Sequence, residues 1–117
     1  MEFTLFFLKL FIYGLSLATP LLVSLIIIII LLGLVVGFRE SWNRFDALYW
    51  AFITTTTVGY GDIRPMAKLS KVLSVLIALT GMIFTGIIVA LAIHAAAESF
   101  KIIGDVEEVK TTIEQLK

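Results

Sequence analysis

Apolar residues fall in two long runs, separated by a stretch in which polar and charged residues are frequent. The first run, residues 21–38, contains no charged side chain, and the second, residues 72–97, contains only His94. Eighteen helical residues rise about 27 Å, which matches the hydrocarbon core of a bilayer. The pattern therefore predicts an all-α membrane protein with two transmembrane helices.

Residues 2–19 are also mostly apolar, but they carry Lys9. A helix running from here through the first apolar run would measure about 54 Å, too long for one straight span. Pro20 is the expected break, because proline lacks an N–H and is tolerated at a helix start. We predict an interfacial helix over 1–19 and an outer helix over 20–38. A tilted extension of the span is the main alternative, and a signal peptide fits the residues less well.

The segment between the two runs holds an apolar island, residues 45–53, that is too short to cross a bilayer. Asn43 can cap a helix there, and Asp46 suits its first turn. The island ends in four threonines and then glycines, which do not continue a helix well. This predicts a helix over 44–55 that enters the membrane, followed by extended chain over 56–62. Such backbone is tolerated at membrane depth only where protein or water surrounds it.

The last segment, residues 101–117, follows an inner helix predicted over 69–98. Its apolar residues recur at spacings of four and three, which is a heptad seam of about two repeats. We expect a short cytoplasmic helix, gathered by an assembly that is held together in the membrane. The seam consists of Ile102, Val106, Val109, Ile113 and Leu116.

Composition narrows the possible functions. Nine Lys and Arg balance nine Asp and Glu, so no basic excess points to a nucleic-acid partner. The chain has no cysteine and one histidine, which excludes disulfides, thiolate metal sites and cysteine nucleophiles. Two spans are too few to enclose anything alone, so we expect an oligomer in a lipid bilayer.

The motif between the spans reads TTTTVGYGD over residues 54–62. Its core, Thr57-Val58-Gly59-Tyr60-Gly61, resembles the potassium-channel selectivity filter, and residues 20–100 resemble a two-transmembrane potassium-channel pore domain. The resemblance implies a homotetramer in the cell membrane that conducts K⁺ passively, is not an enzyme and needs no organic cofactor. It also implies K⁺ sites made by the carbonyls of Thr57, Val58, Gly59 and Tyr60 and by the Thr57 hydroxyl.

The physical demands of conduction agree with this motif. Removing water from a cation is costly in a medium of low dielectric constant, so the path must supply replacement oxygens. Gly59 and Gly61 permit backbone dihedrals that let successive carbonyls face one side. Val58 and Tyr60 then point outward into packing.

The resemblance also implies residues that support the filter. Trp50 is expected to be a hydrogen-bonding neighbour of Tyr60. Tyr49 stands where many relatives carry a tryptophan that donates to the acidic residue after the glycines, here Asp62, and its hydroxyl can serve similarly. Ile53 occupies a position that is glutamate in some bacterial channels, so a carboxylate pair behind the filter is absent.

In the predicted inner helix, Gly81 falls at the family's gating-hinge position, and close packing against the pore helix is the alternative. A helical stripe beginning next to Gly81 is expected to line the cavity and the inner mouth. Contact with another helix explains such spacing equally well. The stripe consists of Met82, Thr85, Val89, Ile93 and Ala97.

Three charged or titratable positions carry further hypotheses. Arg64 lies at the expected outer mouth, where a ring of guanidinium groups would repel external tetraethylammonium; a solvated loop arginine is the alternative. His94 and Glu98 are one turn apart near the expected cytoplasmic end. A proton-sensitive gate is conceivable there, although an interfacial polar pair is the commoner arrangement.

Orientation and function each have alternatives. The resemblance implies that both termini are cytoplasmic, whereas a count of basic residues in the central loop favours the opposite orientation. A less selective monovalent cation channel and a non-conducting membrane scaffold are the other candidate functions. Enzyme classes fit poorly, because Gly59-x-Gly61 lacks the third glycine of a dinucleotide fingerprint and no base accompanies the threonines.

Overall fold

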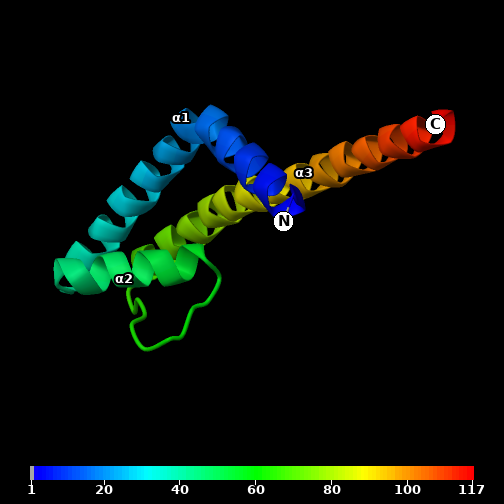
Figure 1. The fold of residues 1–117 in the computed structure, drawn as a ribbon. Helices are drawn as coiled ribbons and strands as arrows, with labels where there is room; N and C mark the ends of the chain where they lie inside the picture. Colours follow the sequence, from blue (N-terminus) through cyan, green and yellow to red (C-terminus); the bar gives the residue numbers. More distant parts are fainter. Residues whose placement is uncertain (1) are drawn as a thin grey trace. The chain divides into compact units, whose positions relative to one another are not determined.

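The structure is a computed structural model that describes residues 2–117. It contains three α-helices, α1 over Glu2–Arg39, α2 over Arg44–Thr55 and α3 over Lys68–Leu116, joined by irregular chain (Figure 1). The described residues contain no strand. By length and composition, α1 and α3 are both able to cross a membrane. The all-helical class and the two long apolar helices are confirmed.

The expected helix end at Pro20 is not found, because α1 continues through this residue. The Ser24 hydroxyl donates to the Pro20 carbonyl oxygen at 2.8 Å on the C-terminal side of the proline. Proline removes one backbone donor from a helix, and the apolar turns on both sides favour helix strongly enough to persist. The first helix therefore covers both of the segments predicted separately.

The second long helix is also continuous where an end was expected. α3 runs without interruption past Glu98 to Leu116. The polar residues that follow Ala97 include Glu and Lys, which are good helix formers. The change from apolar to polar residues after Ala97 therefore occurs within one continuous helix and does not mark its end.

α1 ends in a tight turn before α2. Ser41 adopts a φ of 60°, and the Trp42 N–H donates to the Gly37 carbonyl oxygen at 2.9 Å. A left-handed residue with this hydrogen bond is the usual way to close a helix C-terminus, although glycine is the common residue in that role. The turn places α2 directly after α1.

Contacts divide the chain into two compact units, and the larger one covers Thr19–Ile87. Its core contains Ile29 and Val36 from α1, Trp50 and Ala51 from α2, and Ile77 from α3. Glycines let α1 and α2 approach closely. A Cβ on Gly33 would lie 2.7 Å from the Ala51 Cβ, and Gly37 faces Ala47 in the same way.

Among the described residues, the second unit combines residues 2–18 with Ile88–Lys117. The Phe3 and Phe100 ring centroids lie 4.5 Å apart. A Cβ on Gly14 would lie 3.1 Å from a methyl carbon of Leu91. The first turns of α1 therefore pack along residues 91–100 of α3.

Candidate functional site

The short helix α2 delivers the chain to the candidate site. Its bounds, Arg44–Thr55, are those predicted from the sequence. Asn43 caps its start, because the side-chain oxygen accepts a hydrogen bond from the Asp46 N–H at 2.7 Å. At the other end, the Thr56 N–H and hydroxyl both donate to the Phe52 carbonyl oxygen. A helix with satisfied ends gives the following residues a fixed starting point.

The motif residues are held against the C-terminal end of α2. The Thr57 N–H donates to the Thr54 carbonyl oxygen at 3.2 Å, and the Gly59 N–H donates to the Ile53 carbonyl oxygen at 3.0 Å. Both acceptors belong to the last turn of α2, where carbonyls have no partner within the helix. These hydrogen bonds fix where the non-helical segment leaves the helix.

Backbone dihedrals alternate in hand along the motif. Positive φ angles occur at Thr57 (66°), Gly59 (52°) and Gly61 (83°), but not at Val58 or Tyr60. The two glycines adopt this conformation at low cost, whereas a threonine with positive φ is a rare and strained arrangement. The sequence explains the two glycines, and the conformation of Thr57 was not foreseen.

Within the single chain, the side chains between these residues have little cover. Val58 is 51% exposed and Tyr60 is 73% exposed. The expected hydrogen bond between Trp50 and Tyr60 is not formed in the described chain. Trp50 is instead buried in the core, where its ring meets Trp42 edge-on at a centroid distance of 5.3 Å. The contact between Trp50 and Tyr60 therefore stays a prediction for the assembled protein.

Tyr49 and Asp62 are joined across the motif. The Tyr49 hydroxyl donates to an Asp62 carboxylate oxygen at 3.0 Å, as its position in the sequence suggested. This hydrogen bond raises the pKa of the Tyr49 hydroxyl above its ordinary value, since the neutral hydroxyl is the donor. The bond connects α2 to the chain that follows the glycines.

Glu40 forms a contact that was not predicted from the sequence. Its carboxylate accepts hydrogen bonds from the Met66 N–H and, at 3.0 Å, from the Ala67 N–H. These amides lie just before α3, where the helix dipole favours negative charge. Ala67 has no side-chain acceptor of its own, so Glu40 supplies one from 27 residues away. No local sequence signal marks so distant a pairing.

Gly81 packs against the end of α2. A Cβ at this position would lie 2.7 Å from both the Cα and the carbonyl oxygen of Thr55. Close packing, the alternative to a hinge, is therefore present in the structure. The hinge itself stays a prediction.

The predicted lining stripe is largely uncovered in the single chain. Thr85 is half-buried, and the other four members are exposed. Farther along α3, His94 and Glu98 line an apolar groove of about 670 Å³ with Tyr13 and Leu91. The described residues contain no ion pair between His94 and Glu98.

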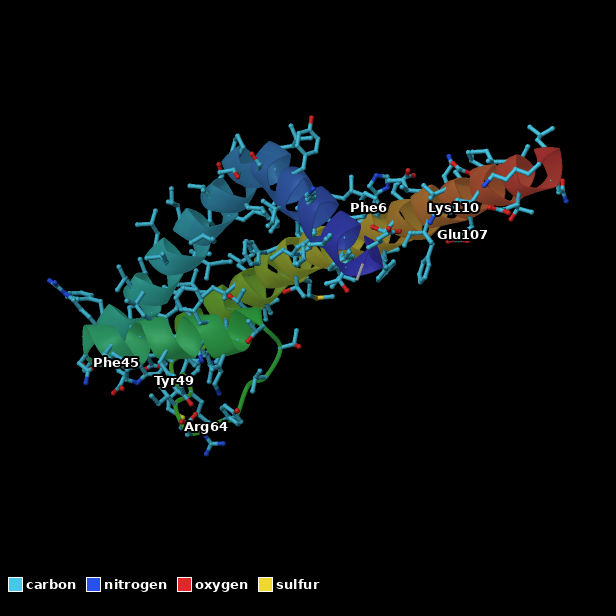
Figure 2. The ribbon with its side chains drawn as sticks, in the orientation of Figure 1. Phe6, Phe45, Tyr49, Arg64, Glu107 and Lys110 are labelled. Atoms are coloured by element: carbon cyan, nitrogen blue, oxygen red, sulfur yellow. The ribbon has the colours of Figure 1, made fainter. Side chains whose placement is uncertain are left out.

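The surroundings of the motif hold two further features. Figure 2 shows Tyr49 on α2 and Arg64 on the chain that follows the motif. Arg64 is exposed. Across residues 2–117, no three His, Asp or Glu side chains gather closely enough to hold a metal ion.

Comparison with known proteins identifies relatives of this segment. A family model described as an ion channel matches residues 21–98. A voltage-gated potassium channel of Aeropyrum pernix is 53% identical over 38 residues, which are 32% of this chain and 13% of the relative. The calcium-gated potassium channel TvoK of Thermoplasma volcanium is 38% identical over 55 residues, 47% of this chain and 16% of the relative.

Plants contain a similar protein as well. The two-pore potassium channel 4 of Arabidopsis thaliana is 44% identical over 39 residues, covering 33% of this chain and 14% of the relative. The chain thus spans less than a fifth of the length of these relatives. No solved structure gives a significant match.

Proposed function

Because the chain belongs to the ion channel family of two-transmembrane potassium-channel pore domains, we propose that it forms a pore that conducts K⁺ selectively and passively across a membrane. The family is one of channels rather than enzymes. The proposal assigns ion binding to the backbone carbonyls of Thr57, Val58, Gly59 and Tyr60 and to the Thr57 hydroxyl. No organic cofactor takes part.

The observation that carries the proposal is the alternation of φ along the motif. Positive values at Thr57, Gly59 and Gly61 give the segment residues of opposite hand in succession. An ordinary strand points consecutive carbonyls to opposite sides, whereas alternation of hand lets them share a side. A row of carbonyls on one side supplies the oxygens that replace the hydration shell of an ion.

Four copies of the chain are proposed to surround the ion path. One segment supplies one oxygen per level, so several chains must meet around an axis. The exposure of Val58 and Tyr60 supports this, because side chains beside a rigid filter need a wall that the single chain lacks. The uncovered stripe on α3, which includes Met82 and Ile93, is assigned to the cavity below.

Helix α2 is proposed to re-enter the membrane and to assist the ion electrostatically. Its C-terminal end, near Thr55, carries the negative end of the helix dipole. Directed at the cavity, four such ends favour a cation at the membrane centre. In this arrangement the central loop faces the cell exterior and both termini are cytoplasmic.

Liposome flux and planar-bilayer recording test the proposal. The purified full-length chain should carry K⁺ into liposomes, and reversal potentials should show K⁺ strongly preferred over Na⁺. Equal permeability of K⁺ and Na⁺ would mean that the protein is a less selective monovalent cation channel instead. If folded, membrane-inserted protein carried no K⁺ flux, the protein would be a non-conducting membrane scaffold.

A glycine variant tests the role of backbone conformation. Gly59→Ala adds a Cβ that meets no heavy atom within 4 Å, but its φ of 52° is unfavourable for alanine. We expect loss of K⁺ selectivity or of flux. Gly86→Ala is the matched control, because its added Cβ also meets nothing within 4 Å and its φ is that of an ordinary helix.

A further inference from the structure

Two apolar stripes run along the part of α3 that follows residue 88. The first contains Val89, Ile93 and Ala97, all exposed, and is the inner end of the proposed cavity lining. The second is the seam. Its residues from Val106 onward are also exposed, with Val109 at 58% and Leu116 at 82%.

The two stripes lie on opposite faces of α3. Ile93 and Ile102 are nine residues apart, and nine residues of α-helix make about two and a half turns. The same separation divides Ala97 from Val106. Supercoiling changes the facing direction by only about 20° per heptad, which is far less than half a turn. A straight α3 therefore cannot turn both stripes toward one axis.

The seam continues the face of α3 that α1 covers. Ala95 and Ser99 are buried, and they precede Ile102 and Val106 by one heptad. Cover from α1 ends near the contact between Phe3 and Phe100. Beyond that contact, no other part of the described chain covers the seam, and Figure 2 places Lys110 on this C-terminal part of α3.

The seam is complementary to a second copy of itself. Val106 and Ile113 alternate with Val109 and Leu116 as the two core positions of a heptad. Asp105 and Lys110 flank this core, five residues apart, and line a groove of about 260 Å³ together with Val106 and Val109. Parallel helices in register bring such flanking residues of neighbouring chains together, and neither residue has an ion pair within the described chain.

We propose that residues 105–116 of several copies form a parallel helical bundle. To allow it, the helix after Ala97 is rotated about its own axis by about half a turn before Val106, so that the seam and the cavity-lining stripe face the same central axis. The proposal rests on the proposed function, which supplies the common axis and assigns the first stripe to the cavity. Gly104 lies in this interval and is its weakest helix former. The bundle is held by the seam and by Asp105 of each chain paired with Lys110 of its neighbour.

Single cysteines distinguish a turned α3 from a straight one, since the native chain has no cysteine. Val109→Cys lies on the seam, and Thr111→Cys lies on the face that continues the cavity lining. In full-length protein in membranes under mild oxidation, we expect Val109→Cys to form covalent dimers at least fivefold faster than Thr111→Cys. Faster crosslinking at Thr111→Cys would mean a straight α3 and overturn the proposal. Failure of both variants to crosslink would mean a different occupant of the seam and overturn it as well.

Charge exchange tests the parallel register. In the Val109→Cys background, Asp105→Lys and Lys110→Asp should each slow crosslinking severalfold, and the double variant should restore it. Glu108→Lys, outside the seam, is the matched control. Failure of the double variant to recover would rule out the ion pair and the register. Liposome flux separates the two proposals: missing flux counts against the channel, whereas normal flux with crosslinking at Thr111→Cys counts against the bundle alone.

Discussion

At the scale of single residues, hydrogen bonds that close the ends of α2 decide how the motif is held. Thr55 and Thr56 are neighbours with opposite surroundings. The Thr56 hydroxyl donates to the Phe52 carbonyl oxygen at 2.9 Å, whereas the Thr55 hydroxyl is buried and has no partner among the described residues. A buried polar group without a hydrogen bond costs about 1–3 kcal/mol.

Thr55→Val should therefore stabilise the protein. Valine has the shape of threonine without the hydroxyl, so we expect a gain of about 1 kcal/mol in the free energy of unfolding. Thermal unfolding of the detergent-solubilised protein measures it. Thr56→Val, the control, loses an exposed hydrogen bond and should lower stability by about 0.5 kcal/mol. A clear loss of stability in Thr55→Val would mean that its hydroxyl finds a partner in the assembled protein.

The hydrogen bond between Tyr49 and Asp62 gives a pH-dependent prediction. It raises the pKa of the Tyr49 hydroxyl, so the bond is intact below the ordinary pKa of tyrosine and is lost as pH rises through the raised value. Asp62→Asn removes the carboxylate acceptor and should lower the pKa of Tyr49. Absorbance titration of tyrosinate, with Tyr49→Phe used to identify the signal, measures the shift. An unchanged Tyr49 titration in Asp62→Asn would contradict the bond.

At the scale of elements, the bounds of α2 were predictable, whereas the continuity of α1 through Pro20 and of α3 past Glu98 was not. Asn43, Asp46 and the threonine-glycine stretch are local signals that act within a few residues, and they gave α2 its bounds. Pro20 is also a local signal, but its effect depends on the turns around it. Glu98 begins a polar stretch that is still helical, so polarity alone did not mark an end.

Parts of the candidate site depend on contacts between distant residues. Glu40 meets the chain before α3 only because α2 and the motif bring the two segments together. Thr57 takes a positive φ, which threonine does not favour, where its own N–H and that of Gly59 are hydrogen-bonded to the last turn of α2. Residue type alone predicts neither feature.

At Gly81, close packing and a hinge role predict different effects of an alanine substitution on stability and on gating. An alanine Cβ there would lie 2.7 Å from the Thr55 backbone, which cannot move away as a flexible side chain can. Gly81→Ala should therefore lower the free energy of unfolding by about 1–3 kcal/mol through overpacking. Gly86→Ala, in open space on the same helix, should raise it by up to about 1 kcal/mol. Unchanged stability in Gly81→Ala, with altered gating, would favour the hinge alone.

At the scale of the whole molecule, symmetry multiplies the effect of each charge. The chain has nine basic and nine acidic residues, so net charge itself gives no preference for cations. In the proposed channel, carbonyl dipoles provide that preference along the axis. A charge near the mouth still acts fourfold, and Arg64 is exposed on the chain that follows the motif.

Arg64 should weaken block by external tetraethylammonium, and the size of this effect should depend on salt. Four guanidinium charges at about 10 Å repel a cation by about 1.7 kcal/mol in unscreened water, and by about 0.6 kcal/mol at 0.1 M ionic strength. Arg64→Gln should therefore strengthen block about threefold at 0.1 M and about sevenfold at 0.01 M. Planar-bilayer recordings at the two salt concentrations measure this dependence.

Replacing Arg64 with an aromatic residue separates charge from ring contact. Arg64→Tyr removes the same repulsion and adds four ring faces that attract a quaternary ammonium ion. External tetraethylammonium should therefore block the Arg64→Tyr channel more strongly than the Arg64→Gln channel at both salt concentrations. The extra gain should change little with salt, because direct contact with a ring is screened less than repulsion at a distance. Lys68→Gln, at the start of α3, controls for a general loss of positive charge. Equal block in the native chain and in Arg64→Tyr would mean that Arg64 is a solvated loop residue away from the ion path.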